Sequence, residues 1–265
     1  MEKMNILIIG AGISGLGAAR LAKHLGHNVF VTSKDLICTS NKNTLKDLGV
    51  DFEEGKHSLS NLEWTNLIIK SPGVPPIISI LKSAKKRNIT IISEVEFAYR
   101  NTNAKILAIT GTNGKTTTAS ILFHIMKNAD LNVALVGNIG VSFSESVIDK
   151  KIEYYVLELS SFQLEDILDF KPNISILLNI DEDHLNRYNN DVDLYLTTKM
   201  RISMNQDSSD SFIYFSNDKN IKMHLDGVSA IQYPFGDQNI NKYGGCLLDD
   251  QIIIKTIKNN FTMTI

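Results

Sequence analysis

The alternation of short apolar segments with amphipathic segments constrains the fold of this chain more than any other feature of its sequence. Apolar runs of strand length recur in the N-terminal part, at Asn5–Ile9, Asn28–Thr32, Val50–Phe52, Asn66–Lys70 and Ile89–Ile92. Helical patterns between these runs are clearest at Ser14–Leu25 and Ile77–Arg87. Parallel strands need long crossover connections, which helices supply, so this order predicts an α/β protein with a parallel sheet.

A polar stretch, Tyr99–Asn103, separates this block from a second block that restarts the same pattern. We therefore expect two domains, over residues 1–100 and 101–265. The second block has expected strands at Lys105–Thr110, Asn132–Val136, Tyr154–Leu159 and Ile174–Asn179, and expected helices at Lys115–Asn128 and Val192–Met204. Strand-like runs then follow at Ser211–Ser216, Cys246–Leu248, Gln251–Lys255 and Phe261–Ile265. Because no turn or cap follows the last run, we expect the chain to stop inside a domain.

The composition excludes several classes of protein. The chain has 265 residues, is 43% hydrophobic and has a net charge of −2, which predicts a packed globular protein without the charge needed to bind nucleic acid. Two cysteines cannot form a disulfide framework, so a reducing compartment is expected. The N-terminal apolar run is too short for a signal peptide or a membrane span. We therefore expect a cytoplasmic protein with no membrane partner.

A glycine turn at Gly111–Thr117, with the sequence GTNGKTT, lies between an expected strand and an expected helix. It is a contracted form of the phosphate-binding loop, since residue 109 is isoleucine where the usual pattern has its first glycine. Backbone amides of residues 111–115 can surround a phosphate, Lys115 can reach the β and γ oxygens, and the Thr116 hydroxyl can bind Mg²⁺. The pattern predicts an ATP-binding P-loop rather than a simple helix cap.

An earlier glycine turn, Gly10–Gly15, has the sequence GAGISG and also joins a strand to a helix. This is the context of a dinucleotide-binding turn, although glycines in such turns also serve packing alone. A nicotinamide cofactor would call for an acidic residue at the end of the second strand, where Thr32, Ser33 and Lys34 stand and Asp35 follows. NAD and other phosphate-bearing ligands therefore both stay open.

Phosphoryl transfer needs a metal shell beyond one threonine, and three later stretches can supply it. Glu158 ends an apolar strand, where ligands of parallel sheets gather. Asp181, Glu182, Asp183 and His184 follow the next strand, and spacing does not choose among them. Lys199 lies in a helical segment whose composition makes it an ordinary surface lysine.

Four motifs in order together resemble the Mur ligases: GTNGKTT, GNIG at 137–140, LELSSFQLE at 157–165 and NIDEDHLNRY at 179–188. SPGVP at 71–75 fits as well, and the resemblance covers essentially the whole chain. It implies a Rossmann-like N-terminal domain followed by a P-loop ATPase-like central domain. The SSFQLE run and the GAGISG turn resemble the branch that joins D-glutamate to UDP-N-acetylmuramoyl-L-alanine in peptidoglycan biosynthesis. ATP first converts the substrate carboxylate to an acyl phosphate, which the amine of D-glutamate then attacks.

The resemblance also implies a role for each motif residue. The ATP phosphates would be held by Gly111, Thr112, Asn113, Gly114, Lys115, Thr116 and Thr117. One Mg²⁺ would be bound by Thr116 and Glu158, and a second by His184 and a carbamylated Lys199. The catalytic residues would be Lys115, Glu158, His184 and Lys199. The nucleotide sugar would contact Ile13, Ser14, Ser71, Pro72, Gly73 and Asn138.

Length separates this chain from the pattern of the family, whose ligases have a third domain that binds the amino acid. We expect the chain to be truncated before that domain, to be monomeric and to be unable to complete turnover. Three alternatives stay open: another amino-acid ligase of the family, a NAD-binding oxidoreductase, and a non-catalytic fragment that binds a nucleotide sugar.

Overall fold

The computed structural model describes residues 2–183, 185–237 and 242–265, and the chain forms two compact units. Unit 1 consists of Met1–Asn103, Val136–Ile152 and Phe162–Phe170. Unit 2 consists of Ala104–Leu135, Glu153–Ser161 and Lys171–Ile265. Each unit is therefore assembled from segments that are far apart in the sequence.

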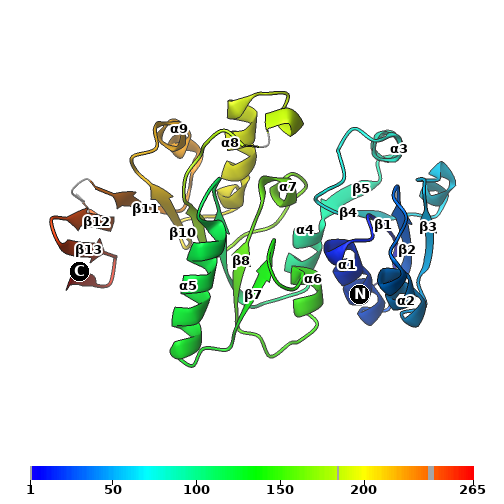
Figure 1. The fold of residues 1–265 in the computed structure, drawn as a ribbon, viewed down its shortest axis with the longest axis horizontal. Helices are drawn as coiled ribbons and strands as arrows, with labels where there is room; N and C mark the ends of the chain where they lie inside the picture. The colour runs from blue at the N-terminus through cyan, green and yellow to red at the C-terminus, as the bar shows by residue number, and fades with distance from the viewer. Residues whose placement is uncertain (1, 184, 238–241) are drawn as a thin grey trace. The chain divides into compact units, whose positions relative to one another are not determined.

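Unit 1 is built on a five-stranded sheet with the strand order β3-β2-β1-β4-β5, and all four of its ladders are parallel. Figure 1 shows the helices that connect these strands. The elements are β1 (Asn5–Ile9), α1 (Ile13–His24), β2 (Asn28–Ser33), α2 (Thr39–Asp47), β3 (Asp51–Glu54), the 3₁₀ helix η1 (Leu59–Glu63), β4 (Leu67–Lys70), α3 (Ser79–Lys86), β5 (Thr90–Ser93), α4 (Glu94–Tyr99), α6 (Phe143–Ser146) and α7 (Ser161–Leu164). The predicted Rossmann-like arrangement is confirmed, and its chain order reverses between β1 and β4.

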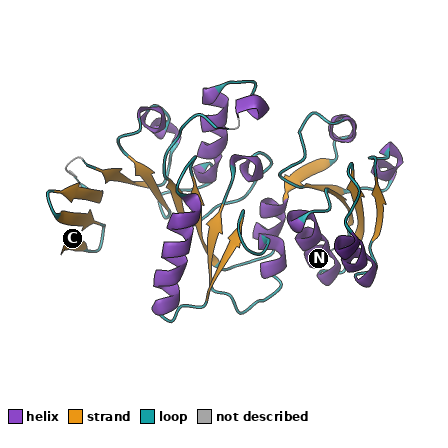
Figure 2. Cartoon of the chain, in the orientation of Figure 1, coloured by secondary structure: helices purple, strands orange, loops and turns teal. Residues whose placement is uncertain are grey.

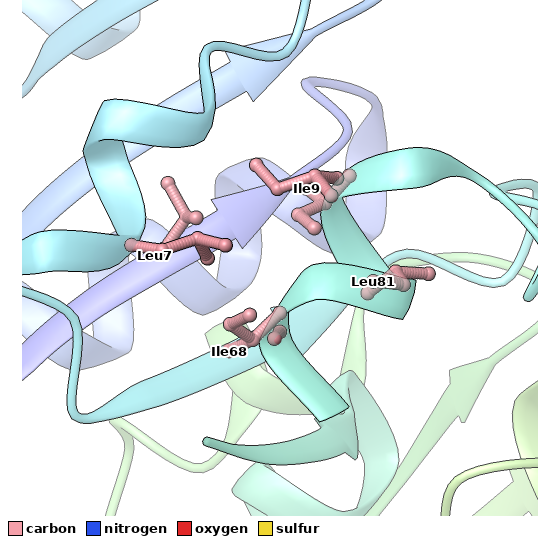
Figure 3. Packing of buried hydrophobic residues seen from close by; sticks show 7 residues of the cluster. Leu7, Ile9, Ile68 and Leu81 are labelled. Carbon is pink, nitrogen blue, oxygen red and sulfur yellow. The ribbon is translucent and has the colours of Figure 1, made fainter. Parts of the chain in front are cut away.

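The core of unit 1 follows from strands that are apolar on both faces. Leu7 and Ile9 of β1, Ile68 of β4 and Leu81 of α3 belong to one buried cluster and point toward one another (Figure 3). Leu7 and Ile68 are also register partners in the sheet. Because side chains alternate along a strand, Ile6 and Ile8 are left for the other face, and both are fully buried. Both faces of the sheet are therefore packed against other parts of unit 1, as is usual for a parallel sheet.

Unit 2 is built on a nine-stranded sheet with the strand order β14-β13-β12-β11-β10-β9-β6-β8-β7. Figure 2 shows its strands and helices, among them the long helix α5, which packs against β6 and β8. The elements are β6 (Lys105–Thr110), α5 (Lys115–Asn128), β7 (Val133–Gly137), β8 (Tyr154–Glu158), β9 (Ile174–Leu177), η2 (Leu185–Tyr188), α8 (Val192–Met200), η3 (Arg201–Ser203), β10 (Ser211–Phe215), α9 (Lys219–Lys222), η4 (Leu225–Gly227), β11 (Ile231–Gly236), β12 (Gly244–Leu248), β13 (Gln251–Lys255) and β14 (Asn260–Thr264).

The second sheet is mixed: most of its ladders are parallel, as predicted, and its last two are antiparallel. The ladders from β8 through β6, β9, β10 and β11 to β12 are parallel, whereas β12–β13 and β13–β14 are antiparallel. The last three strands follow one another through short connections, which join antiparallel but not parallel neighbours. The α/β class itself is confirmed.

Several elements were not predicted, and each lacks the pattern that sequence reasoning depends on. Helix α2 has Leu45 as its one buried residue, so it shows no apolar stripe. Helix α4 also lacks an apolar stripe, because five of its six residues are buried and no face is left exposed. Strand β11 contains Pro234, which ordinarily argues against a strand inside a sheet. No helix among the described residues is long and apolar enough to cross a membrane.

Candidate functional site

The glycine turn of unit 2 joins the buried strand β6 to helix α5, as predicted. Gly114 caps the helix with a φ of +81°, a left-handed conformation that favours glycine. At Gly111, an added Cβ atom would lie 3.0 Å from Leu178 Cβ. Both glycines are therefore required by the path of the loop itself, whether or not a ligand is bound.

Asn179, which lies two residues after the end of β9, holds the glycine turn in place. The backbone amides of Thr112 and Asn113 donate to the Asn179 carbonyl at 3.0 Å and to its Oδ1 at 2.8 Å. Two of the amides expected to surround a phosphate are thus engaged within the protein. The first amides of a helix have no intrahelical partner, so the start of α5, at Lys115 to Thr117, presents the amides suited to an anion.

Two lysine side chains converge on the carbonyl groups of this loop. Lys115 Nζ donates to the carbonyls of Gly111 at 3.0 Å and Thr112 at 2.7 Å. Lys199 Nζ, from α8, donates to the same Gly111 carbonyl at 2.8 Å and lies 4.7 Å from the centre of the Tyr195 ring. The loop therefore brings together two cationic side chains that are well separated in the sequence.

The prediction from composition that Lys199 is a surface residue is wrong. Its exposed fraction is 2%, because α8 turns this side chain inward among Tyr195 and the loop. Burial, followed by the neighbouring charge of Lys115, lowers the pKa of Lys199 to about 7. About half of a lysine with such a pKa is neutral amine near pH 7, whereas a surface lysine is almost wholly protonated there.

Glu158 ends β8 beside the start of α5 and is 1% exposed. Its Oε2 accepts a hydrogen bond of 2.9 Å from the Thr116 hydroxyl. A threonine hydroxyl and a buried carboxylate at the mouth of a phosphate loop are the hard oxygen donors that suit Mg²⁺. Among residues 2–183, 185–237 and 242–265, no group of three or more His, Cys, Asp and Glu side chains has the spacing of a metal site. His184 lies outside the described residues.

Unit 1 has a cavity of about 680 Å³ where the order of its sheet reverses. Carboxyl ends of strands at such a reversal form the usual ligand crevice of doubly wound sheets. The lining includes all six residues predicted to contact the nucleotide sugar, namely Ile13, Ser14, Ser71, Pro72, Gly73 and Asn138. These residues come from three separate parts of the sequence, and the fold brings them to one cavity.

The glycines of the GAGISG turn have different reasons to be glycine. A Cβ atom at Gly15 would lie 1.9 Å from the Gly10 carbonyl oxygen, and one at Gly10 would lie 2.6 Å from Ser71 Oγ. Around Gly12 an added Cβ would meet nothing within 4 Å, and its φ of −83° suits any residue. Packing explains Gly10 and Gly15 but not Gly12, which lines the cavity.

The cavity is also lined by residues that sequence reasoning did not assign. Asn41 of the unpredicted helix α2 is one of them, and its Nδ2 donates to the Ala11 carbonyl at 2.8 Å. His57 is another, with Nδ1 at 2.8 Å from the buried Thr32 hydroxyl. Gln163, from the SSFQLE run, is a third. Of these three residues, only Gln163 lies in a motif that the sequence analysis identified. Asn41 and His57 lie outside any motif.

Comparison with known families identifies both parts of the chain. Residues 109–260 match the Mur ligase middle domain, and residues 4–93 match the Mur ligase MurD-like N-terminal domain. The chain belongs to the Mur ligase family.

Curated relatives agree with this assignment. The chain is 45% identical over 203 residues to the UDP-N-acetylmuramoylalanine–D-glutamate ligase of Bacteroides fragilis, and 46% identical over 204 residues to that of Porphyromonas gingivalis. Each comparison covers 77% of this chain, but 46% and 45% of the respective relatives. The chain thus spans about half the length of the curated relatives it matches.

Solved structures support the fold. The UDP-N-acetylmuramate:L-alanyl-gamma-D-glutamyl-meso-diaminopimelate ligase (MPL) from Neisseria meningitides has a TM-score of 0.64 at 19% identity, over 98% of this chain and 86% of that chain. The murein peptide ligase from Psychrobacter arcticus has a TM-score of 0.60 at 18% identity, over 98% and 61% of the two chains. Both show that the arrangement of the elements is that of Mur ligases.

Proposed function

We propose that this chain supplies the nucleotide-sugar site and the ATP site of a ligase that joins D-glutamate to UDP-N-acetylmuramoyl-L-alanine. The main support is that the six residues assigned to the nucleotide sugar by family resemblance line one cavity. The names of the 40–46% identical relatives favour D-glutamate over another amino acid. Asp35 also lines the cavity, so geometry alone leaves room for NAD, and the family assignment favours the nucleotide sugar.

The residues of unit 2 fit the activation of a carboxylate by ATP. The substrate carboxylate would attack the γ-phosphorus of ATP, forming an acyl phosphate and releasing ADP. The amine of D-glutamate would then displace inorganic phosphate and form the amide. Lys115 would stabilise the charge that develops on the transferred phosphoryl group. In this proposal the first amides of α5 hold the phosphates, which the dipole of the helix favours.

Thr116 and Glu158 would hold one Mg²⁺, since the two oxygen atoms lie 2.9 Å apart at the mouth of the loop. Bound there, the metal would neutralise charge on the phosphate oxygens. Two donors do not complete a shell, so waters and ATP oxygens would supply the others. A second Mg²⁺ is proposed for His184 and a modified Lys199, on family resemblance.

The surroundings of Lys199 fit the proposed carbamate. The neutral amine would attack CO₂, form an N–C bond and release one proton, leaving an anionic group on the side chain. A buried lysine with a pKa of about 7 supplies the neutral amine that this step needs. The negative product would also relieve the repulsion between Lys199 and Lys115. Mass spectrometry of the intact chain under bicarbonate, with Lys199→Met as the control, would detect the added mass.

A titration of the purified chain with UDP-N-acetylmuramoyl-L-alanine, with ATP and Mg²⁺, and with NADH tests the proposed function. A ligand that binds the folded state alone stabilises it by about 2.7 kcal/mol at a hundredfold excess over Kd. We expect the nucleotide sugar and ATP to raise the unfolding temperature and NADH to leave it unchanged. Lys115→Met should abolish the effect of ATP and preserve that of the nucleotide sugar. Stabilisation by NADH without the nucleotide sugar would overturn the proposal.

A further inference from the structure

Three buried charged residues of unit 1 lie outside the sites described above. Lys70 ends β4 and is 1% exposed, while Glu94 and Glu96 of α4 are 2% and 0% exposed. Apart from Arg100, which directly follows α4 and pairs with Glu96, their side-chain partners come from two segments that follow much later in the chain, Val136–Ile152 and Phe162–Phe170. Lys70, Glu94 and Glu96 are called the anchor residues below.

Lys70 joins two stretches of the cavity lining. It directly precedes Ser71, and its Nζ donates to Glu165 Oε2 at 2.9 Å. Asp166 Oδ2 lies 2.7 Å from the same ammonium as an ion pair without hydrogen-bond geometry. Gln163, which lines the cavity, is two residues from Glu165. One buried charge therefore connects the Ser71 and Gln163 sides of the cavity.

Glu94 fixes the other segment. Its Oε1 accepts the Ser144 amide at 2.5 Å, and its backbone carbonyl accepts the Ser144 hydroxyl at 3.3 Å. Two residues earlier, Ser142 packs on α1 so closely that a Cβ atom at Gly17 would lie 1.7 Å from its Oγ. The same segment supplies Asn138 to the cavity. The contacts of Ser142 and Ser144 thus fix the position of the segment just after Asn138.

Glu96 fixes the end of the second segment. Its Oε2 accepts the amides of Leu168 and Phe170, each at 2.9 Å, and its Oε1 accepts Arg100 Nε at 2.7 Å. A carboxylate that binds successive amides in this way holds a loop in one backbone conformation. Such charge-assisted hydrogen bonds are roughly twice as strong as neutral ones.

Burying charged groups carries a large desolvation cost, and apolar residues of similar volume often stabilise a contact between two segments as well or better. What a charged, hydrogen-bonded contact adds is a unique register, since a shifted segment would leave the buried charge without its partner. A unique register matters most where the segment carries residues to a ligand. Gly137, Asn138, Gly140 and Gln163 all line the cavity from these two segments.

We infer that Lys70, Glu94 and Glu96 are positioning residues that hold Asn138 and Gln163 in place to bind the nucleotide sugar. This inference rests on the proposed function for the identity of the ligand. The anchor residues do not touch the ligand themselves. They act by fixing the two segments that supply one wall of the cavity.

The test compares two ligands in a set of paired variants of the chain. Lys70→Met and Glu94→Leu remove an anchor, whereas Lys70→Arg keeps the charge and Glu94→Gln keeps an oxygen that accepts the Ser144 amide. Isothermal titration measures the Kd for UDP-N-acetylmuramoyl-L-alanine and the Kd for ATP with Mg²⁺. We expect each removing variant to weaken nucleotide-sugar binding by about tenfold or more, because small displacements of binding groups are costly. ATP binding should stay unchanged, and the conservative variants should recover most of the loss.

Lys171 gives a matched control from unit 2. It also pairs with two carboxylates, those of Asp207 at 2.5 Å and Asp210 at 3.1 Å, but it lies outside the cavity lining. Lys171→Met should therefore leave the affinity for the nucleotide sugar unchanged. Equal loss of both ligands in Lys70→Met would reduce the anchor residues to a general stabilising role and overturn the inference. Unchanged nucleotide-sugar affinity in both removing variants would overturn it as well.

If the unmodified chain does not bind the nucleotide sugar, the proposed function fails, and hydrogen exchange still tests the anchor residues. In that experiment Lys70→Met and Glu94→Leu should speed amide exchange in residues 162–170 and 137–146 respectively. The strands of the five-stranded sheet of unit 1 should keep their protection. Unchanged exchange in both segments would contradict the inference independently of any ligand.

Discussion

Each unit of this molecule buries one lysine almost completely, and the two lysines are held in different ways. Lys70 in unit 1 is 1% exposed and lies within 3 Å of two carboxylates, at 2.9 Å and 2.7 Å. Lys199 in unit 2 is 2% exposed, donates to the Gly111 carbonyl and lies over the Tyr195 ring. Burial lowers the pKa of Lys199, the cation of Lys115 lowers it further, and the Asp183 carboxylate opposes both effects more weakly.

The difference teaches that the partners of a buried charge, rather than its burial, indicate its role. The two carboxylates beside Lys70 form ion pairs with its ammonium group, which suits a structural link. Around Lys199, burial and the cation of Lys115 outweigh the opposing charge of Asp183 and favour the neutral amine, which suits a chemical reaction. Strongly perturbed titration near a phosphate loop is a common mark of a functional site.

The largest expected effect comes from making the same substitution at both positions. Lys70→Met leaves Glu165 and Asp166 without their cation, and breaking a buried pair costs about 3–5 kcal/mol. We expect about 3 kcal/mol, the low end of that range, because the two carboxylates keep side-chain exposures of 14% and 22%. Lys199→Met should cost little stability at pH 7 or even raise it, since it removes a poorly solvated amine.

Chemical denaturation followed by two signals checks this pair of variants. Trp64 is the one tryptophan of the chain and lies in unit 1, so its fluorescence reports that unit, while far-UV circular dichroism reports both. Lys70→Arg serves as the control that keeps the charge. A Lys199→Met variant that loses as much stability as Lys70→Met would break the comparison between the two lysines.

The two lysines also show how far sequence reasoning reaches. Family resemblance pointed to Lys199, while composition alone placed it on the surface, because an inward turn of α8 leaves no mark in a short helical segment. Lys70 could not be found at all, since its partner Glu165 lies 95 residues away. The strand–helix alternation, the two glycine turns and Glu158 were readable because each depends on neighbours in the sequence.

Elements without a local pattern were missed for the same reason. Helix α4 is almost wholly buried and was not anticipated, yet it carries Glu94 and Glu96, two of the three anchor residues. The cavity was predicted through its motif residues, but Asn41 and His57 reach it from unremarkable sequence. Contacts made by tertiary folding therefore account for most of what the sequence did not reveal.

Glu94 gives a smaller effect that sharpens the comparison, because it is a buried charge of unit 1 that is held as Lys199 is. Its side-chain partner is the neutral Ser144 amide, and burial raises the pKa of Glu94 to about 7 from 4.5. A raised folded-state pKa stabilises the fold fully below pH 4.5, and this contribution is lost as the pH rises through 7.

The expected loss for Glu94 between pH 4.5 and 7 is about 2–3 kcal/mol, which is most of the total that a shift of about 2.5 units gives at 1.36 kcal/mol per unit. This contribution of Glu94 is obtained by measuring the free energy of unfolding of the unmodified chain and of Glu94→Gln across this pH range. The difference between the two proteins should change over this window and level off at higher pH. A constant difference from pH 4 to 8 would show that burial does not raise the pKa of Glu94.

Gly12→Ala should have the smallest effect on stability, and it extends the comparison from charges to the backbone. A Cβ atom at Gly12 meets nothing within 4 Å, and its φ of −83° suits alanine, whereas one at Gly15 would lie 1.9 Å from the Gly10 oxygen. Replacing glycine where alanine fits gains about 0.4–1 kcal/mol from the unfolded chain, and the poorer helix cap that alanine makes offsets part of that gain.

We therefore expect Gly12→Ala to change the free energy of unfolding by about 0.5 kcal/mol or less, whereas overpacking at Gly15→Ala should cost about 1–3 kcal/mol. For ligand affinity, in contrast to stability, we expect Gly12→Ala to have a large effect. If the pyrophosphate of the nucleotide sugar approaches the backbone there, one methyl group lowers its affinity while ATP binding stays unchanged. Equal nucleotide-sugar affinity in Gly12→Ala would place the phosphates elsewhere in the cavity, since packing gives no other reason for a glycine at this position.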